Sequence, residues 1–217
     1  MTKINKKNPV KEILSLLNTH KNTSNTERFF NKNYPDKFFN ISTKILRSIP
    51  KNFSLEEQEF SLFLKSPYNE HRLLGLLFLE KNENKISLYK KYISSVNNWN
   101  LVDSSAHILK NETLFLKTLH KSSNLWHRRI AIISQLSLIK KGNYSLALNF
   151  CKKSLKDSEY LIHKAIGWML REIGKVNEQV LENFLQSYQL PRIALNYSIE
   201  KLSKEKKEFY LKNNGTL

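Results

Sequence analysis

The chain has 217 residues, of which 40% are hydrophobic, enough for one domain with its own core, so an intrinsically disordered protein is excluded. Its 36 lysines and arginines outnumber 19 acids, giving a formal net charge of +17 that favours nucleic acid or an anionic membrane surface as the partner. A single cysteine, Cys151, excludes an intrachain disulfide and a paired-cysteine metal or redox motif.

No apolar run reaches the ~20 residues of a membrane span, and the N-terminal lysines are not followed by the apolar stretch of a secretory signal. We therefore expect a soluble cytoplasmic protein that does not associate with membranes. Cys151 follows Leu148-Asn149-Phe150, a context typical of a small buried hydrophobic residue.

The predicted elements are helices, because no strand-like alternation of useful length occurs and the chain has only five glycines. Start signals are Asn8-Pro9, a capping box at Ser54–Glu57, Ser158 before Glu159, and a first-turn proline at Pro191. Gly142 and Gly174 are predicted helix ends. The predicted helices cover residues 9–19, 24–32, 42–49, 54–65, 68–81, 84–96, 98–109, 111–121, 123–140, 143–156, 158–173, 177–188, 191–202 and 204–212.

The later helices pair every ~30–40 residues, the period of stacked helix-pair arrays of the HEAT and armadillo kind. We therefore predict an all-α fold in which HEAT-like helix pairs form a curved, C-shaped α-solenoid, with residues 1–217 as a single domain. A DNA-binding concave face is expected mainly from residues 97–201.

The three tryptophans of the chain belong to segments with helical spacing. Trp99 and Asp103 are one turn apart, and Lys164, Trp168 and Arg171 at i, i+4 and i+7 share one stripe. A carboxylate flanked by indole rings in a cationic chain indicates chemistry on a polyanion. Arginine is the more informative cation here, since abundant lysine and asparagine are typical of A+T-rich coding, and four of the seven arginines lie in the second half: Arg128, Arg129, Arg171 and Arg192.

At these residues the chain resembles the AlkD-like DNA glycosylases, also called the DNA alkylation repair family. The family's N-N-W-D-L-V-D, L-W-x-R-R-I-A-I and I-x-K-A-x-G-W-x-L-R-E correspond to Asn97–Asp103, Leu125–Ile132 and Ile162–Glu172. The resemblance runs from about residue 27 to 211. It departs from the family at Asn100, which replaces the first aspartate, and at Phe29–Asp36, where a glycine-rich stretch is shortened and has no glycine.

The resemblance implies a monofunctional DNA glycosylase that hydrolyses the N-glycosidic bond of N3- and N7-alkylated purines in duplex DNA. Such a base already carries a positive charge and leaves without prior protonation, so one carboxylate suffices. We expect a monomer that binds alkylated duplex DNA and uses neither a cofactor nor a metal. The implied site consists of catalytic Asp103, Trp99, Trp168 and Arg129, and of DNA-binding Lys164, Arg171, Arg192 and Asn98.

Two other functions stay open: a non-catalytic HEAT-repeat protein that binds structured or damaged DNA, and a helical-repeat protein scaffold. Asp103 together with both tryptophans favours the enzyme over the first, and the clustered arginines favour DNA over the second. Ordinary structural roles are expected for Trp126, as a core residue, and for Arg128, as the ion-pair partner of an acid such as Glu172. The six histidines form no H-x-x-x-H or mixed Cys/His cluster, so no metal site is predicted.

Overall fold

The computed structural model describes residues 8–30 and 34–216, and the chain divides into two compact units, residues 1–101 and 102–217. The boundary between the units falls within helix α6, Trp99–Ser105. In the described residues the units are helical apart from a parallel pair of two-residue strands, which confirms the all-α class.

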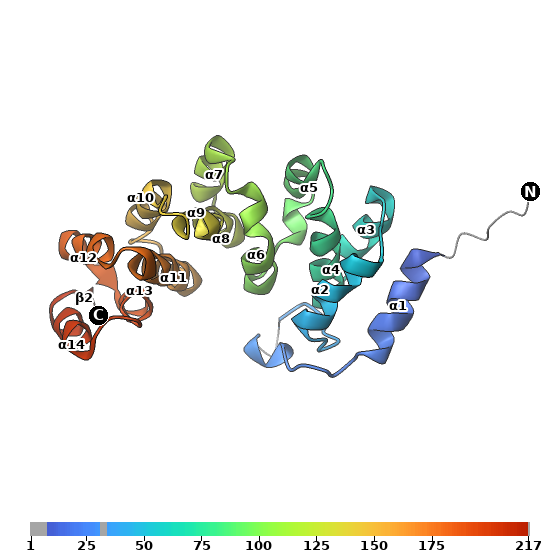
Figure 1. Ribbon diagram of the computed structural model, residues 1–217, viewed down its shortest axis with the longest axis horizontal. Helices are drawn as coiled ribbons and strands as arrows, with labels where there is room; N and C mark the ends of the chain where they lie inside the picture. Colours follow the sequence, from blue (N-terminus) through green and yellow to red (C-terminus); the bar gives the residue numbers. More distant parts are fainter. Residues whose placement is uncertain (1–7, 31–33, 217) are drawn as a thin grey trace, which may run out of the picture. The chain divides into compact units, whose positions relative to one another are not determined.

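Unit 1 contains, in chain order, α1 (Pro9–Thr19), the 3-10 helix η1 (Glu27–Phe29), α2 (Thr43–Asn52), α3 (Glu57–Leu64), α4 (Asn69–Leu79), α5 (Lys85–Lys91), η2 (Ile93–Ser95) and the first turn of α6. Its core is built around α4, which packs along α3 and α2 (Figure 1). Leu74 and Leu79 of α4 are fully buried. Gly75 lets α3 approach, because a Cβ at this position would lie 2.8 Å from the Leu64 side chain.

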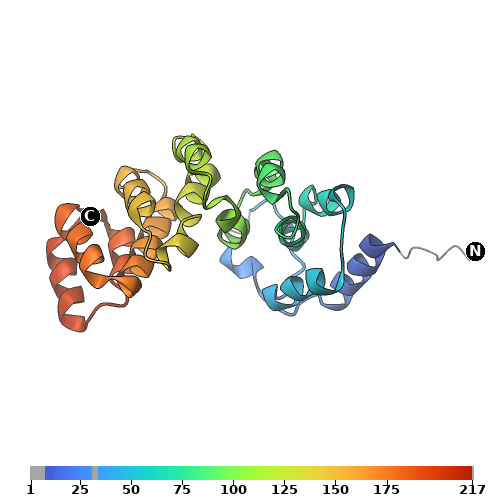
Figure 2. The ribbon, with the colours of Figure 1, turned by 45° about the horizontal axis from the view of Figure 1, so that its top comes forward.

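Unit 2 begins with the rest of α6 and continues through η3 (Ala106–Leu109), α7 (Thr113–His120), α8 (Leu125–Ile133), α9 (Leu136–Ile139), α10 (Ser145–Lys153), α11 (Tyr160–Val176), α12 (Glu178–Ser187), β1 (Leu190–Pro191), α13 (Arg192–Ser198), α14 (Lys204–Asn213) and β2 (Gly215–Thr216). Its centre is α11, which packs against α8, α12 and α13. Helices α12 to α14, orange to red, complete the C-terminal part of this unit (Figure 2).

The contact between α11 and α13 depends on Gly167. A Cβ at this position would lie 2.5 Å from the carbonyl oxygen of Ala194 and 2.5 Å from Cβ of Tyr197. Only a residue without a side chain allows the two helix backbones to come this close. The glycine of the third tryptophan motif is therefore explained by packing.

Several predicted helix ends are confirmed. Asn8 caps α1 by accepting a 3.2 Å hydrogen bond from the backbone N–H of Lys11, and Pro9 occupies the first helical position. Gly142 has φ +81°, the left-handed conformation that favours glycine after a helix. Cys151 is buried as predicted, and this burial raises the pKa of its thiol to about 12.

Other predicted ends are wrong. The capping box belongs to Glu56 and Glu59 rather than to Ser54. Gly174 lies inside α11, which continues for two further, exposed residues to Val176. Pro191 precedes its helix as the capping residue, since its extended ψ of 139° places it in β1. Glu159, not Ser158, is the capping residue of α11.

Three long predicted helices are interrupted. The helix predicted over 123–140 breaks at Ser134 and Gln135, two buried polar residues whose side chains bond each other at 3.0 Å, while Gln135 also donates to the Lys110 carbonyl at 3.3 Å. The Ser134 hydroxyl also donates to the backbone carbonyl of Ala131 at 2.9 Å, and a local side-chain bond of this kind competes with the hydrogen bonds of the helix backbone. The helices predicted over 84–96 and 98–109 each become an α-helix followed by a 3-10 turn, and that over 24–32 reduces to η1, with residues 31–32 outside the described part.

Candidate active site

Trp99 and Asp103 lie one turn apart on α6, on opposite sides of the boundary between the units. The start of α6 is held by Asn98, whose side-chain oxygen accepts a 3.0 Å hydrogen bond from the backbone N–H of Leu101. Asn98 is fully buried, and its amide nitrogen donates to Asp36 at 2.8 Å. This burial favours a positioning role for Asn98 over the direct DNA contact that the sequence predicts.

Asp36 organises a buried polar cluster in unit 1 that the sequence analysis does not identify. Its carboxylate forms an ion pair with Arg72 and accepts hydrogen bonds from Asn98 and, at 3.4 Å, from Asn69. Only 4% of the Asp36 side chain and 8% of the Arg72 side chain are exposed, so each charge needs the other. Asp36 is the last residue of Phe29–Asp36, the glycine-free segment in which the sequence departs from the family resemblance. That departure is the one feature of the sequence that points to this cluster.

The same segment covers one face of the Trp99 indole. The rings of Phe30 and Trp99 stack with centroids 5.3 Å apart and an interplanar angle of 24°. Phe30 also contacts the rings of Tyr34 and Phe38 at 5.0 and 4.8 Å, and the Tyr34 hydroxyl donates to the Asn97 carbonyl at 2.8 Å. Trp99 remains half-buried. Aromatic side chains therefore hold the beginning of α6.

Asp103 of α6 and Arg129 of α8 form a bidentate ion pair within unit 2. Arg129 Nε donates to Oδ1 at 2.9 Å and Nη2 donates to Oδ2 at 2.8 Å, while Nη1 donates to the Leu161 carbonyl at 2.5 Å. The Asp103 side chain is 20% exposed and that of Arg129 is 6% exposed. Burial raises the pKa of Asp103 above its usual range, and the charge and hydrogen bonds of Arg129 act in the opposite direction.

The predicted stripe on α11 is present, but its members differ in their partners. Lys164 and Trp168 are half-buried, and the Lys164 ammonium lies 5.2 Å from the centroid of the Tyr160 ring. Arg171, in contrast, is paired with two carboxylates, Glu172 at 3.4 Å and Glu200. Lys164 has no carboxylate partner among the residues that the structure describes, so it is the better placed of the two cations to bind an external anion.

Arg192 begins α13 and is exposed. Its Nη1 donates to the Leu211 carbonyl at 3.0 Å, which leaves most of the guanidinium directed to solvent. The structure thus brings Asp103 and Arg129 into contact, leaves Lys164 and Arg192 accessible, and engages Arg171 in ion pairs.

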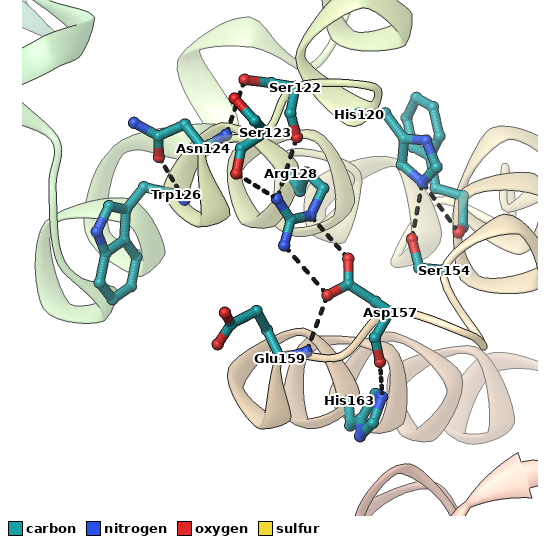
Figure 3. A network of polar contacts seen from close by, with 11 residues as sticks. His120, Ser122, Ser123, Asn124, Trp126, Arg128, Ser154, Asp157, Glu159 and His163 are labelled. Carbon is teal, nitrogen blue, oxygen red and sulfur yellow. Dashed lines mark hydrogen bonds and ion pairs between the residues drawn. The ribbon is translucent and has the colours of Figure 1, made fainter.

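The expected pairing of Arg128 with an acid is confirmed, but the acid is not Glu172. Arg128 instead binds Asp157 through Nε at 2.7 Å and Nη2 at 3.1 Å, and Nη1 donates to the carbonyls of Ser122 and Ser123 (Figure 3). Asp157 lies just before α11, whereas Glu172 is three turns further along that helix and pairs with Arg171. The Asp157 carboxylate also accepts from the Glu159 backbone at 3.0 Å, so the network ties α8 to the beginning of α11.

Trp126, predicted as a core residue, is half-buried, and its indole points away from the Arg128 network (Figure 3). It lies in the first turn of α8, where Asn124 caps its backbone N–H at 2.8 Å.

Within the described ranges, no group of three or more histidine, cysteine or acidic side chains is arranged to hold a metal ion. No helix among the described residues is long and apolar enough to cross a membrane.

Comparison with known proteins places this geometry in a family. No curated protein matches the chain. Among solved structures, a predicted DNA alkylation repair enzyme from Enterococcus faecalis is similar with a TM-score of 0.65 and 19% identity, covering 90% of this chain and 95% of that one. AlkD2 from Streptococcus mutans is similar with a TM-score of 0.59 and 18% identity, covering 90% and 98%. At these identities the likeness concerns the fold.

The family model described as DNA alkylation repair enzyme matches residues 10–202. This range includes all three tryptophan motifs and the ion pair between Asp103 and Arg129. Because the match extends over most of the sequence, the chain belongs to the DNA alkylation repair enzyme family.

Proposed function

We propose that the chain is a monofunctional DNA glycosylase that removes N3- and N7-alkylated purines from duplex DNA. The observation that carries this proposal is the Asp103 carboxylate, held in one orientation by Arg129 yet still 20% exposed at its side chain. A carboxylate that is fixed and accessible can stabilise positive charge without the cost of reorientation during the reaction.

In the proposed reaction the bond between C1′ and the base nitrogen breaks, and its electron pair leaves with the base and neutralises the base's positive charge. The deoxyribose becomes an oxocarbenium ion, which Asp103 stabilises electrostatically. A water oxygen, oriented by Asp103, bonds to C1′ and releases its proton to solvent. Because the alkylated base supplies its own activation, no general acid is needed.

The other residues take supporting roles in this proposal. Arg129 directs its guanidinium N–H groups at Asp103 and Leu161, so we assign it to orienting the carboxylate rather than to the DNA backbone. Trp99 and Trp168 offer ring faces to the cationic nucleotide, each worth roughly 0.5–2 kcal/mol. Lys164 and Arg192 bind phosphates. We further propose that helices within residues 97–201 form the DNA-facing side of a single, curved HEAT-like array that acts as a monomer.

The direct test is release of 7-methylguanine from methylated duplex DNA. The wild type should release this base and 3-methyladenine, and Asp103→Asn should reduce the rate by about a hundredfold or more, equivalent to about 2.7 kcal/mol, while duplex affinity is kept. Uracil and 8-oxoguanine should stay in place, since these neutral bases need protonation or close base recognition. An unchanged rate in the variant would remove Asp103 from the mechanism.

Strand cleavage provides a second readout. A lysine that formed a Schiff base would be trapped on DNA by borohydride, and we expect no such adduct because Lys164 is assigned to phosphate. Covalent trapping, or efficient excision of uracil, contradicts a monofunctional alkylpurine glycosylase.

One observation favours the second candidate function, a non-catalytic protein that binds structured or damaged DNA. Phe30 covers one face of Trp99 in the segment that replaces the family's glycine-rich stretch. A covered indole has one ring face for a nucleotide instead of two. Under this alternative, duplex DNA containing an abasic site binds more tightly than undamaged duplex, yet no base is released from methylated DNA.

A further inference from the structure

A groove of about 740 Å³ lies between α10 and α12 in unit 2. The candidate site residues of unit 2 do not line it. None of the described residues that do line it carries a carboxylate. The lining side chains that can bind a ligand are three aromatic rings, three carboxamides and one ammonium group: Tyr144, Phe184, Tyr188, Asn143, Asn149, Asn183 and Lys152. The Asn183 carboxamide oxygen already accepts a hydrogen bond from Gln179 at 2.9 Å.

The charge of the groove is positive at two places. The Lys152 ammonium lies 5.0 Å from the centroid of the Tyr188 ring. Lys140 and Lys141 directly precede Gly142, which lines the groove, and both are exposed. In the part of the chain that the structure describes, no carboxylate pairs with these three lysines. A ligand with negative charges therefore complements this surface.

The aromatic rings of the groove can stack with planar groups of a ligand. Tyr144 and Tyr188 are half-buried, and Tyr188 is supported from within by Phe184 at a centroid distance of 4.9 Å. Rings supported in this way serve as stacking platforms for nucleobases. In duplex DNA both faces of a base are covered by its neighbours, so only an unpaired base can stack here.

The carboxamides can bind the edges of the same bases. Asn143 and Asn149 are exposed, and within the described residues neither side chain has a hydrogen-bond partner. A carboxamide presents a donor and an acceptor side by side, which matches the hydrogen-bonding edge of a base. The nearby hydroxyl of Ser145 adds a further donor for a phosphate or a sugar.

From this combination we propose that the groove between α10 and α12 binds single-stranded nucleic acid. Lys152, Lys140 and Lys141 bind the phosphates, and Tyr144 and Tyr188 stack with unpaired bases. The volume of the groove is within the range of small-molecule sites, about 300–1,000 Å³, and suits a short stretch of a strand. This binding is independent of base excision and of the function proposed for Asp103.

Two adjacent lysines of α10 provide a matched test. Lys152 lines the groove, and Lys153, which is also exposed, does not. Lys152→Glu and Lys153→Glu change the net charge by the same amount, so the two variants differ only in whether the altered side chain lines the groove. Fluorescence anisotropy with a labelled oligothymidylate should show a loss of affinity of roughly tenfold for Lys152→Glu, and of at most about twofold for Lys153→Glu. Tyr188→Ala should cost roughly tenfold, the lower part of the range for losing one stacked base.

Controls separate the groove from the candidate active site. Affinity for a duplex of the same length should be unaffected by Tyr188→Ala, and Lys164→Ala should weaken duplex binding while leaving oligothymidylate binding unchanged. Asn149→Ala, an exposed substitution that does not threaten folding, should also reduce oligothymidylate affinity.

Three results would overturn the proposal. Equal losses in Lys152→Glu and Lys153→Glu would show that only the overall charge matters. Wild-type affinity in both Tyr188→Ala and Asn149→Ala would exclude base contacts. Displacement of oligothymidylate by poly-glutamate as effectively as by unlabelled oligothymidylate would assign the groove to acidic peptides instead.

Discussion

Asp103 is a carboxylate whose burial and whose ion pair have opposite effects on its charge. Burial is the larger effect and raises its pKa, and Arg129 lowers it. Since an acid with a raised pKa in the folded state binds protons more readily than in the unfolded chain, ionisation of Asp103 lowers folding stability as pH rises through that pKa. Ionised Asp103 therefore lowers the stability of the fold, and titratable groups whose pKa is shifted in this way cluster at functional sites.

The pH dependence of excision follows from this pKa. Because the proposed mechanism needs the ionised carboxylate, the single-turnover rate of 7-methylguanine release should fall as pH decreases, with a midpoint above 3.8, the ordinary value for aspartate. Arg129→Lys, which loses the bidentate contact, should move that midpoint higher. Spontaneous loss of the base from free DNA is subtracted at each pH. A midpoint at or below 3.8 contradicts the assignment.

Phe30 and Phe29 are adjacent phenylalanines with different surroundings. Phe30 stacks on Trp99, whereas Phe29 is 62% exposed. In a chain where Trp126 and Trp168 are replaced by phenylalanine, Phe30→Ala should shift Trp99 emission to longer wavelength and increase quenching by acrylamide. It should also lower the free energy of unfolding by about 0.5–1.5 kcal/mol, the contribution of an aromatic pair.

Phe29→Ala is the control for this prediction, and it should leave both the emission and the unfolding free energy close to those of the parent. If the two variants behave alike, Phe30 does not hold Trp99 in solution.

At the scale of the helix, α11 contains two glycines that differ in what surrounds them. A Cβ at Gly167 would meet the backbone of α13, at 2.5 Å from the Ala194 carbonyl, while a Cβ at Gly174 would meet only the end of the Leu181 side chain, also at 2.5 Å. A backbone contact can be relieved only by separating two helices, but a flexible side chain can change its rotamer.

We therefore expect opposite outcomes for the two alanine substitutions. Gly167→Ala should lower the free energy of unfolding by about 1–3 kcal/mol, the usual cost of overpacking. Gly174→Ala should be neutral or stabilising by up to about 1 kcal/mol, because alanine favours the helix. Urea denaturation of the two variants measures both effects. A stable Gly167→Ala protein would mean that α11 and α13 separate at little cost.

At the scale of the whole molecule, the net charge of +17 overstates the number of cations that can bind DNA. Arg72, Arg128, Arg129 and Arg171 are each paired with carboxylates of the protein itself. In each pair the carboxylate neutralises the charge of the arginine, and a DNA phosphate would have to displace that carboxylate in order to bind the guanidinium. The affinity for DNA should therefore depend on lysines and on the few arginines that remain exposed.

The salt dependence of duplex binding tests this distinction. The logarithm of the binding constant should fall with the logarithm of salt concentration by about 0.9 for each phosphate that the protein neutralises. Lys164→Ala should make the slope shallower by about that amount, and Arg171→Ala, whose charge is already paired, should change it less. A slope near zero for the wild type excludes a binding mode based on phosphates.

The sequence by itself determined the helical class, the order of the elements and the family. Helical periodicity and caps are local properties, so α1 was predicted to the residue, and the three tryptophan motifs identify the family without knowledge of any contact. The lone cysteine was recognised as buried from its immediate neighbours alone.

Only the tertiary structure decided which side chains are paired. Arg128 binds Asp157 and not Glu172, Asn98 is buried against Asp36, and Phe30 covers Trp99. Each of these partners is 29 or more residues distant along the chain, and the choice among many acids, amides and rings depends on which helix faces meet. Helical spacing predicts which residues share one face of a helix. Which residues that face contacts is determined by how the helices pack against one another.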